Sequence, residues 1–308
     1  MGTLSYSFVV PTHNSAGFAS RLFDSIPRRD DTEVIVVDDH SAPDELAATR
    51  ELAVGLPNLV FLESEGRGAG AARNVGIAAA RGRWLVFPDS DDYFTAALPA
   101  AMDKYAQADC DLVMFRPATA GDVPRTAVFE EMFDRGDIVE FGYTQGSMWS
   151  KFIRRDLVEA HRVRCSETMV CNDLYFSVQA FAASAKPVLD PATIYVLTVR
   201  PGSLAIREQP LADLVTRADE AVRATQFIRN HAGADWRKAV PNSGYILREA
   251  FAWHGVPGLL AVARRYAGHH VPLFHEPGLG KLPKRALSAL WAGTFGKAKY
   301  AAARTRGE

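Results

Sequence analysis

Aspartates gather at two points of this sequence, each directly after a short apolar run. Asp38-Asp39 follows residues 33–37, and Asp89-Ser90-Asp91-Asp92 follows residues 84–87. We expect the two points to lie at adjacent strand ends, where their carboxylates would repel one another unless a divalent cation offset the repulsion. Mg²⁺ and Mn²⁺ prefer carboxylate oxygens, and Mg²⁺ is often shared between one or two carboxylates and substrate phosphates. The pattern therefore predicts a metal and a diphosphate bound together. The alternative for a single aspartate is a turn or a helix cap.

The elements that would position these aspartates alternate regularly over the first 116 residues. Strand-like runs occupy residues 5–10, 33–37, 59–62, 84–87 and 112–115, and apolar residues recur at helical spacing over residues 18–26, 43–54, 70–80 and 98–105. This alternation predicts an α/β fold with a mostly parallel sheet and helices on both faces. In such sheets ligands bind outside the carboxyl ends of the strands, which is where the aspartates lie.

After residue 116 the pattern is less regular. Residues 117–150 have no clean period, whereas residues 174–183 have helical spacing and residues 194–199 form a last strand-like run. From about residue 211 onward the sequence is helical, with a break at Pro257-Gly258. We therefore expect a helical C-terminal region beyond the sheet.

The overall composition argues against several classes of protein. The 308 residues include 35 basic and 36 acidic side chains, without the strongly basic domain that is usual in nucleic-acid-binding proteins. The 3 cysteines form no Cys-x-x-Cys pair, which argues against a disulfide framework and a thiolate zinc site and favours a reducing cytoplasm. We find neither a signal peptide nor an apolar run long enough to span a bilayer, and therefore expect a cytoplasmic chain.

Two common nucleotide sites lack their motifs. A dinucleotide site requires G-x-G-x-x-G directly after the first strand, but residues 11–15 contain no glycine, and Gly66–Gly70 follows the third strand without completing the motif. The P-loop pattern is also absent. A sugar nucleotidyltransferase would need a glycine-rich loop with a lysine after the first strand, which residues 11–15 do not provide.

Four short motifs point to one family when they are taken together. They are Val9-Val10-Pro11-Thr12-His13-Asn14, Val36-Val37-Asp38-Asp39-His40-Ser41, Gly70-Ala71-Ala72-Arg73-Asn74-Val75-Gly76 and Phe87-Pro88-Asp89-Ser90-Asp91-Asp92. In this order and spacing they resemble the inverting family 2 glycosyltransferases with the GT-A fold. The resemblance extends over residues 4–205, and implies a metal-dependent hexosyltransferase.

The resemblance also implies roles for residues on the donor side. The nucleotide-sugar pocket would be formed by Pro11, Thr12, Asn14, Asp39, Arg73, Asp89, Ser90, Arg200 and Ser203. Within it, Asp39 would accept a hydrogen bond from the base, usually uracil, and Arg73 would contact the nucleotide or its phosphates. Asp91 would hold Mn²⁺ or Mg²⁺, directly or with help from Asp92.

On the acceptor side, Met148–Arg155 resembles the family's Trp-x-Lys segment. Trp149 would offer a flat face to a sugar ring, with Lys151 and Asn172 nearby; the alternative for Trp149 is core packing. Asp173 would be the general base, although a helix N-cap is an equally ordinary use of Asn172-Asp173. Here Asn172 replaces a glutamate that is usual in the family.

These roles predict three parts in the chain. Residues 1–116 would bind the nucleotide sugar, residues 117–205 would form the acceptor half of the same GT-A domain, and residues 206–308 would be a helical C-terminal region. The predicted reaction transfers a sugar, usually from a UDP-sugar, to a hydroxyl of a glycan or a lipid-linked glycan precursor. A non-catalytic nucleotide-sugar-binding protein is the alternative from another class, for which Asn172 is the only hint.

The last 28 residues, Lys281 to Glu308, form a basic segment with interleaved Trp291 and Phe295. Such a segment is typical of peripheral contact with an anionic membrane surface. The alternative is a solvated helix that packs its apolar side on the domain.

Overall fold

The protein forms two compact units, residues 1–198 and residues 199–308, which are described separately. The structure, a computed structural model, describes residues 3–120, 124–199, 208–233, 236, 244–267 and 269. The predicted donor-site residues Arg200 and Ser203 lie outside the described residues, as does the basic segment, residues 281–308.

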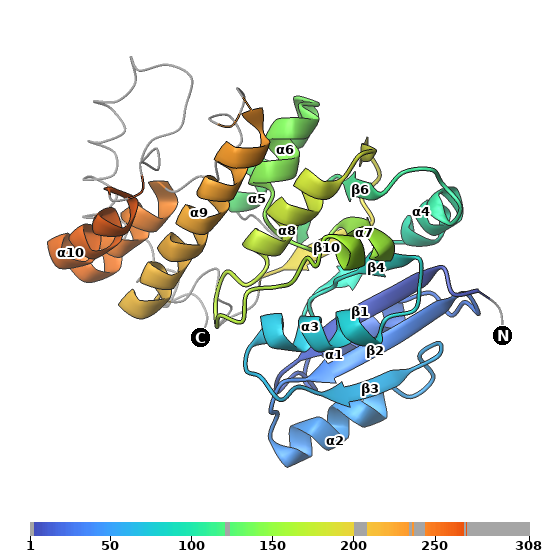
Figure 1. Ribbon diagram of the computed structural model, residues 1–308. Helices are drawn as coiled ribbons and strands as arrows, with labels where there is room; N and C mark the ends of the chain where they lie inside the picture. Colours follow the sequence, from blue (N-terminus) through green and yellow to red (C-terminus); the bar gives the residue numbers. More distant parts are fainter. Residues whose placement is uncertain are drawn as a thin grey trace. The chain divides into compact units, whose positions relative to one another are not determined.

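Strands and helices alternate along the first unit (Figure 1). Up to residue 120 the elements are β1 (Tyr6–Thr12), α1 (Ala19–Ser25), β2 (Thr32–Asp38), α2 (Pro43–Leu52), β3 (Val60–Glu63), α3 (Ala69–Ala79), β4 (Trp84–Val86), β5 (Tyr93–Phe94), α4 (Leu98–Tyr105), β6 (Leu112–Phe115) and β7 (Thr119–Ala120). The elements that follow are α5 (Pro124–Asp134), α6 (Ile138–Thr144), β8 (Lys151–Arg154), α7 (Arg155–Ala160), α8 (Leu174–Ala183), β9 (Pro187–Asp190) and β10 (Tyr195–Thr198).

Seven of the described strands form one sheet, in the order β3-β2-β1-β4-β8-β6-β9. Neighbouring strands are parallel except at β8, which is antiparallel to both β4 and β6. The prediction of a mostly parallel sheet with flanking helices is therefore confirmed. β1 lies between β2 and β4, however, so the two aspartate-bearing strand ends are not adjacent, and that expectation was wrong.

Different helices cover the two faces of this sheet, because successive side chains of a strand point to opposite sides. Tyr6, Phe8 and Val10 of β1 belong to a core cluster that includes apolar side chains of α1 and α4. On the opposite face Val9 lies against α3, where a Cβ atom on Gly76 would come within 2.3 Å of Val9 Cγ1. Glycine at position 76 therefore allows α3 to pack closely on β1.

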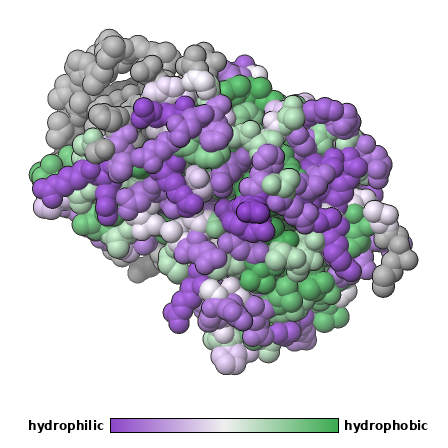
Figure 2. Space-filling model, in the orientation of Figure 1, coloured by the Kyte–Doolittle hydropathy of each residue, from purple (hydrophilic) through white to green (hydrophobic). Residues whose placement is uncertain are grey.

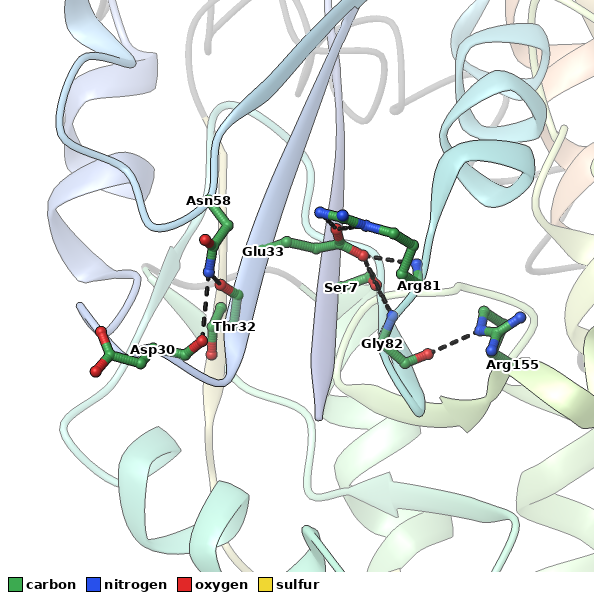
Figure 3. A network of polar contacts seen from close by, with 8 residues as sticks. All are labelled: Ser7, Asp30, Thr32, Glu33, Asn58, Arg81, Gly82 and Arg155. Carbon is green, nitrogen blue, oxygen red and sulfur yellow. Dashed lines mark hydrogen bonds and ion pairs between the residues drawn. The ribbon is translucent and has the colours of Figure 1, made fainter. Parts of the chain in front are cut away.

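A buried carboxylate ties the turn between α3 and β4 to the first residues of β1 and β2 (Figure 3). Glu33 is fully buried and accepts hydrogen bonds from Ser7 Oγ at 2.6 Å, from the Arg81 amide at 2.6 Å and from the Gly82 amide at 3.2 Å. The Arg81 guanidinium pairs with the same carboxylate at 2.7 Å. A buried charge is tolerated only when it is paired and hydrogen-bonded, and this network meets that condition. It thereby holds the start of β4 in place.

Several elements were not expected from the sequence. Residues 117–150, which lack a clean period, contain the helices α5 and α6, and Asp137 caps α6 by accepting from two backbone amides. The strands β8 and β9 were also not predicted. β10 joins β5 and β7 in a second, smaller sheet of three described strands.

The second unit is described mainly through two helices, α9 (Leu211–His231) and α10 (Gly244–Ala267), which pack against each other. α10 is interrupted at Gly255, whose φ of 63° lies in the left-handed region, two residues before Pro257. The expected helical C-terminal region is therefore present, with a break close to Pro257.

The face of the molecule drawn in Figure 2 carries mostly hydrophilic side chains, with smaller hydrophobic areas between them. Exposed large apolar side chains in the described part of the chain include Met169, Val54 and Val256. Among the described residues we find no helix with the length and apolar character needed to cross a lipid bilayer.

Candidate active site

The loops after β1 and β2 are joined to each other at the carboxyl end of the sheet. Asn14, whose φ is 48°, accepts a hydrogen bond through its side-chain Oδ1 from the Ala42 backbone amide at 2.9 Å. The backbone amide of Asn14 donates to Ser41 Oγ at 2.8 Å. Thr12 is buried at the end of β1. Of the predicted nucleotide residues in this region, Asn14 is exposed, whereas Pro11 and Thr12 are buried.

Asp39 connects the end of β2 to the start of α3. Its Oδ2 accepts a hydrogen bond from the Gly68 amide at 2.8 Å, and Gly68 has a φ of 88° that favours glycine. The neighbouring Asp38 accepts from the Ser41 amide at 2.9 Å. Both carboxylates therefore have donors within the protein, and Asp39 lies beside the first turn of α3.

Arg73 brings three separate segments together. This buried side chain on α3 donates from Nη1 to Asn172 Oδ1 at 2.7 Å and from Nη2 to Asp89 Oδ1. Burial acts to lower the pKa of Arg73, but the charges of Asp89 and other neighbours outweigh it and raise that pKa. Burial also raises the pKa of Asp89, against the effect of the Arg73 charge. One guanidinium thus links residues predicted for the donor side and for the acceptor side.

The acidic loop, residues 89–92, is held by protein donors at each end. Asp92 is fully buried; its Oδ2 accepts from the Tyr195 hydroxyl at 2.5 Å and its Oδ1 accepts from the Thr198 amide at 2.6 Å. Burial, followed by the charge of Asp89, raises the pKa of Asp92 to about 8. The carboxylate predicted to assist a metal therefore has two protein partners that the sequence did not suggest.

Asp91 lies between the two held ends of the acidic loop. Its carbonyl accepts from Arg21 Nη2 at 3.0 Å, and the adjacent Ser90 hydroxyl lies 3.1 Å from Ser15 Oγ. Among the described residues no group of three or more His, Cys, Asp or Glu side chains is arranged to hold a metal. A site completed by substrate phosphates needs only one or two protein carboxylates, and Asp91 fits such a site.

Asp173 stands at the first turn of α8 without capping it. It occupies the N-cap position, but its side chain makes no capping hydrogen bond. Its charge acts on Arg73, Asp89 and the buried Lys151, so it lies within electrostatic reach of the acidic loop. The half-buried carboxylate is therefore not used for the helix-cap role that was the alternative.

Asn172, the residue before Asp173, uses both polar atoms of its side-chain amide. While Oδ1 accepts from Arg73, Nδ2 donates to the Thr168 carbonyl at 3.2 Å, which a glutamate would be unable to do. A Cβ atom on Gly70 would lie 2.0 Å from the Ser166 carbonyl oxygen, so α3 packs tightly on the same loop.

Trp149 and Lys151, predicted on the acceptor side, are both buried. Trp149 is 7% exposed and stacks on Tyr195 with ring centroids 5.8 Å apart. Lys151 is 3% exposed, donates from Nζ to the Gln145 carbonyl at 2.7 Å, and has its pKa lowered by burial to about 7. Both side chains therefore pack in the interior of the protein.

Sequence reasoning did not find Tyr195 and Arg21. Both act through contacts with residues 70 or more positions away in the chain, and no local pattern marks such contacts. The only available signal was indirect, because a buried acidic loop must find hydrogen-bond donors.

Comparisons with known proteins point to one family. The family model described as Glycosyl transferase family 2 matches residues 7–165. The succinoglycan biosynthesis protein ExoO of Rhizobium meliloti (strain 1021) is 30% identical over 250 residues, which cover 73% of this chain and 68% of ExoO. The protein EpsH of Bacillus subtilis (strain 168) is 29% identical over 63% of this chain, and the match spans 61% of EpsH.

Solved structures with the same fold include two with bound donors. Staphylococcus aureus TarS 1–349 in complex with UDP-GlcNAc has a TM-score of 0.68 and 22% identity, covering 87% of this chain and 82% of the TarS chain. The mannosyltransferase PcManGT from Pyrobaculum calidifontis, in complex with GDP-Man and Mn²⁺, has a TM-score of 0.55 and 21% identity, covering 99% of this chain and 84% of its own. At 22% and 21% identity, these similarities show that the chain has the same fold as the two solved structures.

Proposed function

Because this chain belongs to glycosyl transferase family 2, we propose that it transfers a sugar from a UDP-sugar to a hydroxyl of a glycan or lipid-linked glycan, with inversion at the anomeric carbon. Family membership makes the chain a glycosyltransferase that uses a nucleotide sugar. We propose in addition that the nucleobase of the donor is uracil, that the transfer inverts the anomeric carbon, that a divalent metal takes part and that the acceptor is a glycan or a lipid-linked glycan.

The observation that carries the proposal is the pair of contacts made by Arg73. Its guanidinium donates to Asp89 on the acidic loop and to Asn172, which directly precedes Asp173. The Arg73 guanidinium therefore connects the acidic loop, where a diphosphate would bind, to the segment that carries Asp173, where the acceptor hydroxyl would bind. An inverting transfer needs its base and its leaving group on opposite sides of one carbon, and a base and a diphosphate site on two different segments joined by Arg73 support that mechanism.

In the proposed reaction, Asp173 takes the proton of the acceptor hydroxyl as general base. The hydroxyl oxygen forms a bond to the anomeric carbon from the face opposite the diphosphate, and the bond from that carbon to the diphosphate oxygen breaks. The electron pair leaves with the nucleoside diphosphate. Arg73 holds Asp89 in place throughout, and Arg200, which lies outside the described residues, is proposed to assist at the diphosphate.

A divalent cation is part of the proposal on the donor side. Asp91 would hold it, since it lies on the acidic loop between Asp89 and Asp92, whose contacts with Arg73 and Tyr195 hold the two ends of that loop. When bound, Mn²⁺ or Mg²⁺ would stabilise the negative charge on the leaving diphosphate. The PcManGT complex contains Mn²⁺.

The choice of UDP rests on Asp39 and on a structural neighbour. TarS has been solved with UDP-GlcNAc, and its name describes a poly(ribitol-phosphate) β-N-acetylglucosaminyltransferase. Succinoglycan synthesis, the process that names ExoO, supports a glycan as acceptor. The match spans only 36% of full-length TarS, so the acceptor of this chain is proposed from chemistry rather than taken from that protein.

A panel of nucleotide sugars tested by thermal shift with Mn²⁺ would examine the donor, because a ligand of the folded state raises its melting temperature. We expect the UDP-sugars to give the largest shift. Proton NMR of the product formed with that donor should then show an inverted anomeric centre. A retained configuration would contradict the mechanism, and a donor that binds without any release of UDP would favour the non-catalytic alternative.

A further inference from the structure

A single hydroxyl group connects the two ends of the acidic loop. Tyr195 Oη accepts a hydrogen bond from the Asp89 amide at 2.9 Å and donates one to Asp92 Oδ2 at 2.5 Å. The Asp92 amide also donates to the Asp89 carbonyl at 3.2 Å, so the loop is closed into a turn. Asp91 lies within this turn, between the two residues that share the hydroxyl.

The Tyr195 ring is itself held in place by its neighbours. It is fully buried, stacks on Trp149 at an interplanar angle of 17° and meets Phe94 edge-on with ring centroids 5.2 Å apart. The hydroxyl therefore has little freedom to move. Because β10 carries both Tyr195 and Thr198, the two donors to Asp92 come from one rigid strand.

A second contact, made by a side chain of α1, also fastens this loop. Arg21 of α1 donates from Nη2 to the Asp91 carbonyl at 3.0 Å and to Thr198 Oγ1 at 2.6 Å, while its guanidinium lies over the Tyr93 ring at 4.6 Å. The backbone of Asp91 is thus tied to the end of β10 independently of Asp92.

We propose that Tyr195 and Asp92 are positioning residues that hold the acidic loop in the shape in which Asp91 binds the cation and diphosphate of the donor. This inference rests on the proposed function. It gives Asp92 a structural task in place of the metal-ligand task expected from the sequence. A site whose groups are already held in place does not spend binding energy on ordering them, so loss of the hydroxyl should weaken the metal-dependent part of donor binding.

The first test uses UDP and Mn²⁺ as probes in isothermal titration calorimetry. For Tyr195→Phe we expect about tenfold weaker UDP binding in Mn²⁺, the size expected for one lost buried hydrogen bond, and little change in EDTA. Tyr6→Phe is the matched control, because it removes a buried hydroxyl that donates to the Met102 carbonyl at 2.6 Å in the same core cluster. That control should bind as the wild type does.

The second test separates a positioning role from a ligand role at Asp92. Asparagine keeps an oxygen for the Thr198 amide and an amide group that can donate to Tyr195, so Asp92→Asn should retain most of the Mn²⁺-dependent UDP affinity that Asp92→Ala loses. Equal losses in the two variants would make Asp92 a metal ligand and overturn the proposal.

The outcomes also separate this inference from the proposed function. Wild-type protein that binds UDP with help from Mn²⁺, together with a Tyr195→Phe variant that binds equally well, would overturn the positioning role alone. Wild-type protein that gains no UDP affinity from Mn²⁺ would overturn both.

Discussion

Arg73 on α3 and Asp89 on the acidic loop form an ion pair in which the arginine side chain is 7% exposed. The same guanidinium reaches Asn172, so a single cation connects three segments that are far apart in the sequence. Removal of Asp89 would leave the buried Arg73 charge without this partner. The contact should therefore matter for stability as well as for binding.

We therefore predict that Arg73→Met lowers the free energy of unfolding by about 2 kcal/mol or more, since Asp89 and the buried Asn172 both lose the charged donor of a hydrogen bond. Urea denaturation at pH 7.5 would measure the loss. Arg50→Met is the control, because Arg50 pairs with Glu63 at 2.8 Å on the surface, where both side chains are about half exposed. Arg50→Met should lower the free energy of unfolding by less than about 1 kcal/mol. Similar losses in the two variants would show that the Arg73 pair has no special role.

The second prediction concerns Asp173 as a base rather than a cap. Asp173→Asn should lower turnover by a factor of about 10² to 10⁴, the usual contribution of a general base, and leave UDP affinity nearly unchanged. UDP-release kinetics and calorimetry would measure the two quantities. Wild-type turnover in this variant would exclude the catalytic role.

Stability measurements provide the matched control for the same residue. Asp137 accepts hydrogen bonds from the Val139 and Glu140 amides, both at 3.0 Å, and so caps α6, whereas the Asp173 side chain makes no such bond. Asp137→Ala should therefore cost about 1 kcal/mol in the free energy of unfolding. Asp173→Ala should cost clearly less, and an equal loss would return Asp173 to the helix-cap role.

The third prediction concerns the metal. Asp91→Ala should lower UDP affinity in Mn²⁺ to the level that the wild-type protein has in EDTA, because the carboxylate that holds the cation is gone. Calorimetry with and without Mn²⁺ measures both values. Asp44→Ala, an exposed acidic change in the first turn of α2, should keep the full effect of Mn²⁺. A persistent Mn²⁺ effect in the Asp91 variant would place the cation on other residues.

The sequence predicted what local patterns determine. Periodicity predicted the α/β alternation, and the short motifs predicted which residues gather at the strand ends. Strand order depends on pairings between distant segments, so the insertion of β8 between β4 and β6, with Trp84 opposite Arg154, had no local signal. For the same reason the sequence indicated that aspartates cluster, but not that Tyr195 and Gly68 would supply their donors.

The burial of Lys151 could not be predicted from the sequence, because a lysine usually keeps its charged group in water. Here burial lowers its pKa from 10.5 to about 7, although the charge of Asp173 acts in the opposite direction. Between these two pH values the unfolded chain binds the proton more tightly than the folded protein. The buried lysine therefore destabilises the fold fully below about pH 7 and progressively less as the pH rises towards 10.5.

The fourth prediction follows from this sign. Lys151→Met should raise the free energy of unfolding at pH 6 by a few kcal/mol, since each pKa unit corresponds to about 1.4 kcal/mol, reduced by the lost hydrogen bond to the Gln145 carbonyl. The gain should shrink steadily in urea titrations from pH 7 to pH 10. Lys186→Met, at an exposed lysine paired with Asp109, should show no such trend. A variant that is less stable than the wild type at every pH would mean that Lys151 stays charged and forms a favourable pair with Asp173.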